Sequence, residues 1–280
     1  MGKLAIQLLF LITFFLVLVS HILPITSQEV GEQAAAEDER EFNYDPYSEK
    51  GPAHWGRIRP EWSACSNGTM QSPIDLLNEI VDIVPDLGRL NRSYKPGNAI
   101  LKNRGHDIML KWESGAGIIE INGTEYVLNQ CHWHSPSEHT IDGERFALEL
   151  HMVHESLDGK IAVVGILYKI GRPDSFLSSL TKQLEYVAGT TERDTVVGVV
   201  DPRNIKIGSR KYYRYLGSLT TPPCTENVVW TVVKKVRTVT KEQVQLLRVA
   251  VHDDSDTNAR PLQPLNGRTV KLFIPEDKDD

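Results

Sequence analysis

Residues 125–134 read EYVLNQCHWH, and after a turn residues 147–154 read ALELHMVH. Both stretches alternate apolar with polar side chains, and in a β-strand successive side chains point to opposite faces of the sheet. The Asp142-Gly143 dipeptide between them is a typical hairpin turn. The two stretches are therefore expected to lie side by side as antiparallel strands.

The same pattern extends along much of the chain, with a second hairpin turn at Asn122-Gly123. We expect strands at 107–112, 117–121, 125–134, 145–154, 161–169, 213–217, 227–236 and 269–273. Helical periodicity is limited to 174–188, which starts at Asp174, and to 240–251, which starts at Thr240. The sequence predicts a mainly β fold (β-rich α+β) around one large, mostly antiparallel sheet.

The N-terminus has the pattern of a secretory signal peptide. Lys3 precedes an apolar run over residues 4–19, and a polar segment follows. We expect a signal at 1–27, cleaved between 20 and 28. An uncleaved membrane anchor is the alternative, but no second apolar span follows, so no membrane association is expected after cleavage.

The rest of the chain divides by composition. Residues 28–41 are acidic and lack large apolar side chains, as in a disordered leader. Residues 42–275 contain no linker and are expected to form a single domain, and 276–280 form a charged tail. The formal net charge of −6 argues against a nucleic-acid partner.

Two further features fit an exported protein. Three N-glycosylation sequons begin at Asn67, Asn91 and Asn122. In an oxidising compartment two of the three cysteines are expected to pair, which leaves one over; they are Cys65, Cys131 and Cys224.

Five of the nine histidines fall between 132 and 154. His132 and His134 are two residues apart on one expected strand and share a face, with Cys131 on the opposite face. His151 on the returning strand can complete a set of three imidazoles, which is typical of a catalytic zinc site with one open position. Spacing alone leaves this interpretation and that of ordinary buried histidines equally open.

Six ordered segments resemble the alpha-class carbonic anhydrases, in particular exported plant-type members. They are 71–75 (QSPID), 103–106 (NRGH), 130–139 (QCHWHSPSEH), 147–154 (ALELHMVH), 217–223 (GSLTTPP) and 258–264 (NARPLQP). The resemblance implies a twisted sheet with a few short peripheral helices and a conical cavity.

The resemblance also implies roles for individual residues. His132, His134 and His151 would bind one zinc ion per chain, with their outer nitrogens held by Gln130, Glu149 and Asn258. Thr220 would orient the zinc-bound hydroxide and donate its hydroxyl proton to Glu138, beside Thr221 at the substrate. His106 would be the proton shuttle. The apolar wall that accepts carbon dioxide would comprise Val153, Val163, Leu219, Val228 and Trp230.

The implied reaction is the zinc-dependent, reversible hydration of carbon dioxide to bicarbonate and a proton. Zinc-bound hydroxide attacks carbon dioxide, and an exposed histidine then passes a proton to buffer. The family's exported members also imply a Cys65–Cys224 disulfide, which leaves Cys131 free. The expected destination is extracellular, through the secretory pathway, or the plastid stroma by the same route.

The chain departs from the family pattern at Arg104, where many members have a second Asn. A cation at this position is expected to disfavour the protonated form of His106. Tyr44 is our candidate for the family's N-terminal aromatic residue. Two other functions are open alternatives, namely a binding or storage protein that has lost activity, and a zinc hydrolase acting on esters.

Overall fold

The computed structural model describes residues 41–189, 194–207, 210–251 and 255–275. The expected signal peptide and charged tail lie outside these ranges, as does the expected leader except for Glu41, which forms an ion pair with Arg59. Among the described residues, no helix has both the length and the apolar character needed to cross a membrane.

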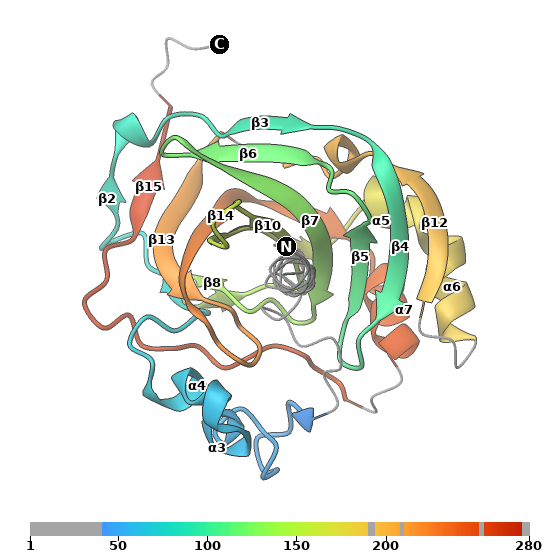
Figure 1. The fold of residues 1–280 in the computed structure, drawn as a ribbon, viewed down its shortest axis with the longest axis horizontal. Helices are drawn as coiled ribbons and strands as arrows, with labels where there is room; N and C mark the ends of the chain where they lie inside the picture. The colour runs from blue at the N-terminus through green and yellow to red at the C-terminus, as the bar shows by residue number, and fades with distance from the viewer. Residues whose placement is uncertain (1–40, 190–193, 208–209, 252–254, 276–280) are drawn as a thin grey trace, which may run out of the picture.

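One mixed sheet of twelve strands dominates the fold and curves around the centre of the molecule (Figure 1). Its main path, in order of neighbours, is β12 (Asp194–Val200), β4 (Gly97–Asn103), β5 (Ile108–Trp112), β7 (Thr124–His134), β10 (Leu148–Glu155), β11 (Ile161–Ile170), β14 (Glu226–Val239), β13 (Tyr212–Ser218), β15 (Lys271–Phe273) and β2 (Asp82–Ile83). β6 (Gly117–Ile121) pairs with β7, and β3 (Asn91–Tyr94) pairs with β6. Most pairs are antiparallel, but β11–β14 and β15–β2 are parallel. The predicted β-rich fold is confirmed.

The remaining elements are short. A second sheet joins β1 (Asp75–Leu76), β8 (Thr140–Ile141) and β9 (Glu144–Arg145). The α-helices are α3 (Trp55–Ile58), α4 (Ala64–Asn67), α5 (Ser175–Ser179), α6 (Thr181–Ala188) and α7 (Lys241–Val251), and the 3-10 helices are η2 (Pro60–Trp62), η3 (Pro85–Leu87) and η4 (Pro202–Asn204). Figure 1 shows α3 and α4 at one end of the molecule, apart from α6 and α7 beside the sheet.

Two expected elements are divided in the structure. The strand expected at 145–154 is broken between β9 and β10, because the Phe146 N–H donates to the Ser137 hydroxyl instead of a ladder partner. The helix expected at 174–188 becomes α5 and α6, which meet at Leu180. Asp174 caps α5 as expected, since its carboxylate accepts from the N–H groups of Phe176 and Leu177.

The two faces of β7 and β10 bury different kinds of side chain. Cys131 and Trp133 of β7, with Leu150 of β10, belong to the largest apolar cluster, into which helices α5, α6 and α7 also pack. The intervening residues His132 and His151 lie on the opposite face, since strand side chains alternate. The helices therefore cover one face, and the other face is left for the histidines.

A separate aromatic cluster forms where the described chain begins. It contains Phe42, Tyr44, Trp55 and Trp62, together with the disulfide between Cys65 and Cys224. Because the two cysteines are 159 residues apart, this bond fastens the N-terminal segment to the loop that follows β13.

Candidate metal centre

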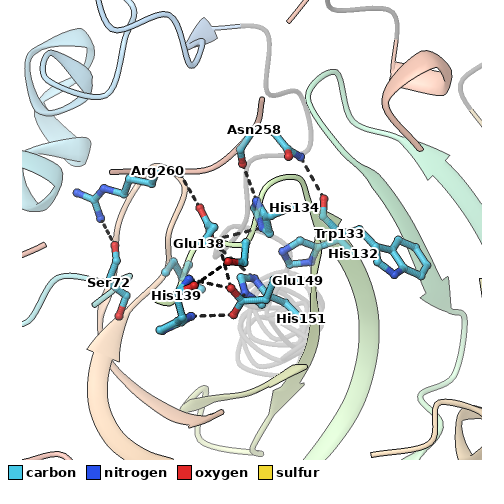
Figure 2. Close-up of polar contacts among 12 residues, drawn as sticks. Ser72, His132, Trp133, His134, Glu138, His139, Glu149, His151, Asn258 and Arg260 are labelled. Carbon is cyan, nitrogen blue, oxygen red and sulfur yellow. Dashed lines mark hydrogen bonds and ion pairs between the residues drawn. The ribbon is translucent and has the colours of Figure 1, made fainter. Parts of the chain in front are cut away.

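Three buried imidazoles converge on the face of the sheet opposite the helices. β7 and β10 pair so that His151 lies directly across from His132, while His134 follows one alternation later on β7. The ring centroids are 5.1 Å apart for His132 and His134, 5.2 Å for His132 and His151, and 4.6 Å for His134 and His151. One nitrogen from each ring lies within 4.8 Å of the others, so the set could hold a metal ion (Figure 2).

The outer nitrogen of each ring is already occupied by an acceptor. His132 Nδ1 donates to Gln130 Oε1 at 2.9 Å, and His151 Nε2 donates to Glu149 Oε1 at 2.9 Å. His134 Nδ1 donates to the main-chain carbonyl of Asn258 at 2.7 Å. These three acceptors are the residues implied by the resemblance, although Asn258 acts through its backbone. Because the outer nitrogens are the donors, the inner nitrogens of neutral rings carry lone pairs, as metal ligands require.

Burial favours the neutral form of two of these imidazoles, His132 and His151. The pKa of His132 lies well below its usual value because of burial first, and then because of the charge of Arg104 and of the neighbouring histidines. Burial also lowers the pKa of His151, even though the Glu149 carboxylate acts in the opposite direction. A neutral imidazole is the form that binds a metal.

Glu149 is buried and accepts four hydrogen bonds. Its Oε1 accepts from His151 and from His139 Nδ1 at 2.7 Å, and its Oε2 accepts from the main-chain N–H groups of Glu138 and His139. Burial alone would raise the pKa of Glu149, but its interactions with His139 and His151 hold it well below its usual value. Hydrogen bonds from the two histidine rings thus explain why Glu149 lies close to both, and a second metal site is not needed to explain it.

The Glu149 network continues into the β13 strand. His139 Nε2 lies 2.7 Å from the Tyr215 hydroxyl, which lies 2.8 Å from Ser72 Oγ. Neither His139 nor Tyr215 is predicted from the sequence to have a role. His139 is the last residue of the segment QCHWHSPSEH, and its place in a segment that resembles the family is the one sequence feature that could have indicated a role for it.

Glu138 has one carboxylate oxygen in use and one without a partner. Its Oε1 accepts from the Arg260 N–H at 2.9 Å, which Figure 2 also shows. Its Oε2 is 3.6 Å from His134 Nε2 and 3.9 Å from His151 Nδ1, and both Oε2 and His134 Nε2 lack a hydrogen-bond partner among the described residues. The hydrogen bond expected from Thr220 to Glu138 is therefore not formed, although Thr220 and Thr221 are both buried.

The five side chains expected to form an apolar wall belong to one cluster. Val163, Val228 and Trp230 are buried in it, and Val153 and Leu219 pack against it. The Trp230 ring centroid lies 4.8 Å from that of His151. This cluster therefore borders the histidines directly.

His106 is buried, whereas the sequence predicted an exposed imidazole. Only 7% of the residue is exposed, and its Nε2 lies 2.7 Å from the main-chain carbonyl of Phe42. The predicted aromatic neighbour, Tyr44, is present with its ring centroid 5.5 Å from that of His106. The N-terminal segment covers the imidazole, and no local pattern around residue 106 signals this.

Arg104 is also buried and forms a two-pronged ion pair with Asp107. Its Nε donates to Asp107 Oδ1 at 2.8 Å, and its Nη2 pairs with Oδ2. The cation expected beside His106 is present, and Asp107 pairs with it from three residues away. Its effect on the protonation of His106 stays a prediction.

The cysteines and sequons are placed as follows. Cys65 and Cys224 form the disulfide implied by the resemblance, and Cys131 is free and buried. The asparagines of all three sequons, Asn67, Asn91 and Asn122, are exposed. Glycosylation of each remains a prediction.

Comparison with known proteins points to one family. The family model described as eukaryotic-type carbonic anhydrase matches residues 50–274. Alpha carbonic anhydrase 7 of Arabidopsis thaliana is 65% identical over 249 residues, which cover 89% of this chain and 90% of that relative.

Solved structures give the same result. Dioscorin complexed with ascorbate superimposes with a TM-score of 0.83 at 46% identity, over 85% of this chain and 99% of that one. The alpha-carbonic anhydrase from Thermovibrio ammonificans, in complex with the inhibitor sulfanilamide, gives a TM-score of 0.74 at 34% identity, over 82% of this chain and 98% of that one.

Proposed function

The chain belongs to the eukaryotic-type carbonic anhydrase family and is a carbonic anhydrase, and from this premise we propose that one zinc ion, held by His132, His134 and His151, serves its hydration of carbon dioxide. The observation that carries the proposal is the convergence of three inner imidazole nitrogens whose outer nitrogens are already bonded.

The donor set fits zinc. His134 Nε2 is a buried nitrogen with no hydrogen-bond partner among the residues described, and an unsatisfied buried polar atom is unfavourable unless a ligand occupies it. Three imidazoles leave one coordination position open, as in catalytic zinc sites. When bound, zinc supplies a Lewis acid that lowers the pKa of a coordinated water, a chemistry for which carbonic anhydrase is itself the standard example.

The surrounding residues fix the orientation of the three imidazole rings. Gln130, Glu149 and the Asn258 carbonyl each fix one ring by accepting from its outer nitrogen. Acceptors of this kind set the tautomer and the ring orientation, and their loss typically reduces metal affinity about 10- to 100-fold.

Glu138 and Thr220 act together in the proposed mechanism. Glu138 Oε2 is a buried acceptor without a donor among the described side chains, and the family resemblance assigns the Thr220 hydroxyl as its donor, although that bond is not formed in this structure. If Thr220 donates its proton to Glu138, its own oxygen can only accept a hydrogen bond. Thr220 would then accept only from a hydroxyl group beside it and would hold that group in one orientation next to Thr221.

The apolar cluster is suited to hold carbon dioxide. Val163, Val228 and Trp230 present no polar atom toward a small neutral molecule, and Val153 and Leu219 extend the same surface. A small apolar wall of this kind suits a tiny apolar substrate, which favours hydration of carbon dioxide over hydrolysis of a larger ester.

His106 is the proposed route by which the released proton reaches buffer. Arg104 lies beside it in a buried ion pair with Asp107. The N-terminal apolar run further supports entry into the secretory pathway, with an extracellular or plastid destination, and mass spectrometry of the mature protein would give the cleavage site and the occupied sequons.

The test is stopped-flow carbon dioxide hydration by the purified protein, before and after zinc removal, with the zinc content measured in parallel. We expect one zinc per chain, a hydration rate that is lost on zinc removal, and recovery when zinc is returned. His134→Ala should bind less zinc and lose the rate. A protein that binds no zinc, or whose rate never exceeds that of buffer, would refute the proposal and leave a binding or storage role.

A further inference from the structure

β11 has a gap in the row of side chains that faces the metal centre. Val163 and Leu167 lie on this face and belong to the apolar cluster that borders the histidines, while Gly165 between them has no side chain. β10 and β11 pair so that Gly165 lies directly across from His151. The position of β11 that faces His151 is therefore the one without a Cβ.

The backbone does not explain why this position is glycine. Gly165 is absent from the positions with a positive φ and has the backbone of an ordinary strand residue. Glycine in the middle of a strand weakens the strand, and it often marks a place where another group approaches the backbone closely. The reason for Gly165 is therefore to be found in what lies above it.

The space that a side chain at residue 165 would fill holds the Glu149 carboxylate. A Cβ added to Gly165 would lie 3.0 Å from Glu149 Oε1, compared with 3.5 Å from Val232 Cγ2 and 3.7 Å from Trp230 Cζ3. Well-packed carbon atoms lie roughly 3.5–4.0 Å apart, so the two apolar neighbours would tolerate a methyl group. Of these three side chains, only Glu149 would have to move.

Glu149 cannot move without loosening a hydrogen bond. Its Oε1 accepts from His151 Nε2 at 2.9 Å and from His139 Nδ1 at 2.7 Å, and its Oε2 accepts from two main-chain N–H groups (Figure 2). Glu149 is fully buried, so water does not replace a bond that is lost. A shift of Oε1 by a few tenths of an ångström away from residue 165 lengthens its bonds to the rings.

The bond from His151 is the one that concerns the metal. Because Nε2 of this ring donates to Glu149, its Nδ1 is left as the ligand atom. The acceptor fixes the ring orientation and hence the direction of the Nδ1 lone pair. Room for Glu149 above residue 165 is thus room for a correctly aimed His151.

We propose that Gly165 is a positioning residue for the metal centre, because its missing side chain gives the Glu149 carboxylate the room to hold His151 in the orientation that binds zinc. The inference rests on the proposed function, since it concerns the same metal ion. It predicts that one methyl group at residue 165 weakens zinc binding although all three imidazoles are retained.

The first test measures the zinc dissociation constant of Gly165→Ala by competition with a chelator. We expect it to rise about tenfold, at the lower end of the range for loss of such an acceptor, since Oε1 is displaced and not removed. Gly171→Ala is the matched control, because a Cβ there would lie 2.9 Å from Thr238 Cγ2, an equally close contact at an exposed residue just beyond β11. It should stay within about twofold of wild type. A Gly165→Ala protein that binds zinc as tightly as wild type would overturn the proposal.

A double variant separates this route from a general disturbance of packing. In Glu149→Asp the carboxylate is one methylene group shorter and is drawn back from residue 165. Adding Gly165→Ala to this variant should change the zinc dissociation constant by less than about twofold. Equal effects of Gly165→Ala in both backgrounds would show that residue 165 acts by another route. If Gly165→Ala alone is too unstable to purify, Glu149→Asp should restore its yield, and failure to do so would also count against the proposal.

Nuclear magnetic resonance tests the contact in the zinc-free protein. With 15N-labelled histidine, the His151 Nε2–H signal is identified by its loss in His151→Gln. The proton of a shorter hydrogen bond resonates further downfield, so Gly165→Ala should move this signal upfield and Gly171→Ala should not. A signal that does not move in Gly165→Ala would contradict the proposal. A wild-type protein that shows this hydrogen bond but binds no zinc would instead refute the proposed function.

Discussion

At the scale of single residues, the region of Arg104 shows how a charge can be buried without disturbing the site beside it. The side chains of Arg104 and Asp107 are 3% and 1% exposed, and they bond through two prongs across the tip of the β4–β5 hairpin. Placing two charges in the interior is unfavourable by itself, so the pair depends on each partner being present. The hairpin that presents His106 therefore depends on Asp107 as well as on Gly105, which adopts a positive φ of 116° at the turn.

Replacing Asp107 with Asn should destabilise the protein strongly, because Arg104 then loses its carboxylate partner in a buried site. We expect the free energy of unfolding to fall by about 3–5 kcal/mol, measured by urea denaturation of the zinc-loaded protein. Glu113→Gln, at an exposed acidic residue just beyond β5, is the control and should change it by less than about 0.5 kcal/mol. A loss below about 1 kcal/mol for Asp107→Asn would show that the pair is not needed.

His154 gives the protein a dependence on pH that is separate from the metal centre. It is fully buried, and burial lowers its pKa from 6.5 to about 4, despite a hydrogen bond to the Ala162 carbonyl. The native state holds it neutral, whereas the unfolded state takes up a proton below pH 6.5. This contribution to stability is therefore complete above pH 6.5 and is lost as the pH falls toward 4.

Between pH 7 and pH 5, the free energy of unfolding should fall by about 2 kcal/mol more in wild type than in His154→Gln, because the variant has no proton to take up on unfolding. Urea titrations at both pH values measure this difference. The histidines at the metal centre are the same in both proteins, so their contribution cancels. Parallel stability profiles would mean that His154 takes up its proton without unfolding.

At the scale of elements, strand prediction succeeded where a segment carries its own apolar pattern. The side chains of β7 alternate or are buried, and those of β11 are buried over its first eight residues; both strands were expected within a residue at each end. β3, β4 and β12 were not expected. β3 (NRSY) has three exposed residues out of four, and β12 contains Gly198 at an irregularity in its pairing. Such strands form because a neighbouring strand supplies hydrogen-bond partners for their backbone. The local sequence of the strand does not show that this partner will be there.

The candidate site also has a part that local sequence predicts and a part that it does not. The spacing of His132 and His134 predicts their common face, and the Asp142-Gly143 turn predicts that His151 lies opposite, because both follow from local strand geometry. The contacts of His106 and His139 were not predictable by such rules. Their partners Phe42 and Tyr215 lie 64 and 76 residues away along the chain, so only the assembled fold brings them together.

At the scale of the whole molecule, one region joins segments from both ends of the chain close to the site. The Arg260 guanidinium donates to Gln71 Oε1 and to the Ser72 carbonyl, both at 2.8 Å, and to the Cys65 carbonyl at 2.9 Å. Its main-chain N–H donates to Glu138. The carboxylate beside the metal centre is thus positioned through the same residue that fastens the N-terminal segment.

The Cys65–Cys224 disulfide reinforces this junction, and its removal tests how much the fold depends on it. The bond closes a loop with a sequence separation of 159, so it greatly restricts the unfolded chain. The double variant Cys65→Ser/Cys224→Ser should lose roughly 2–5 kcal/mol in free energy of unfolding, measured by urea denaturation. Reductant should destabilise wild type by the same amount and leave the double variant unchanged, since Cys131 is already free. An equal urea midpoint for wild type and the double variant would mean that packing and hydrogen bonds alone, including those of Arg260, hold the two ends together.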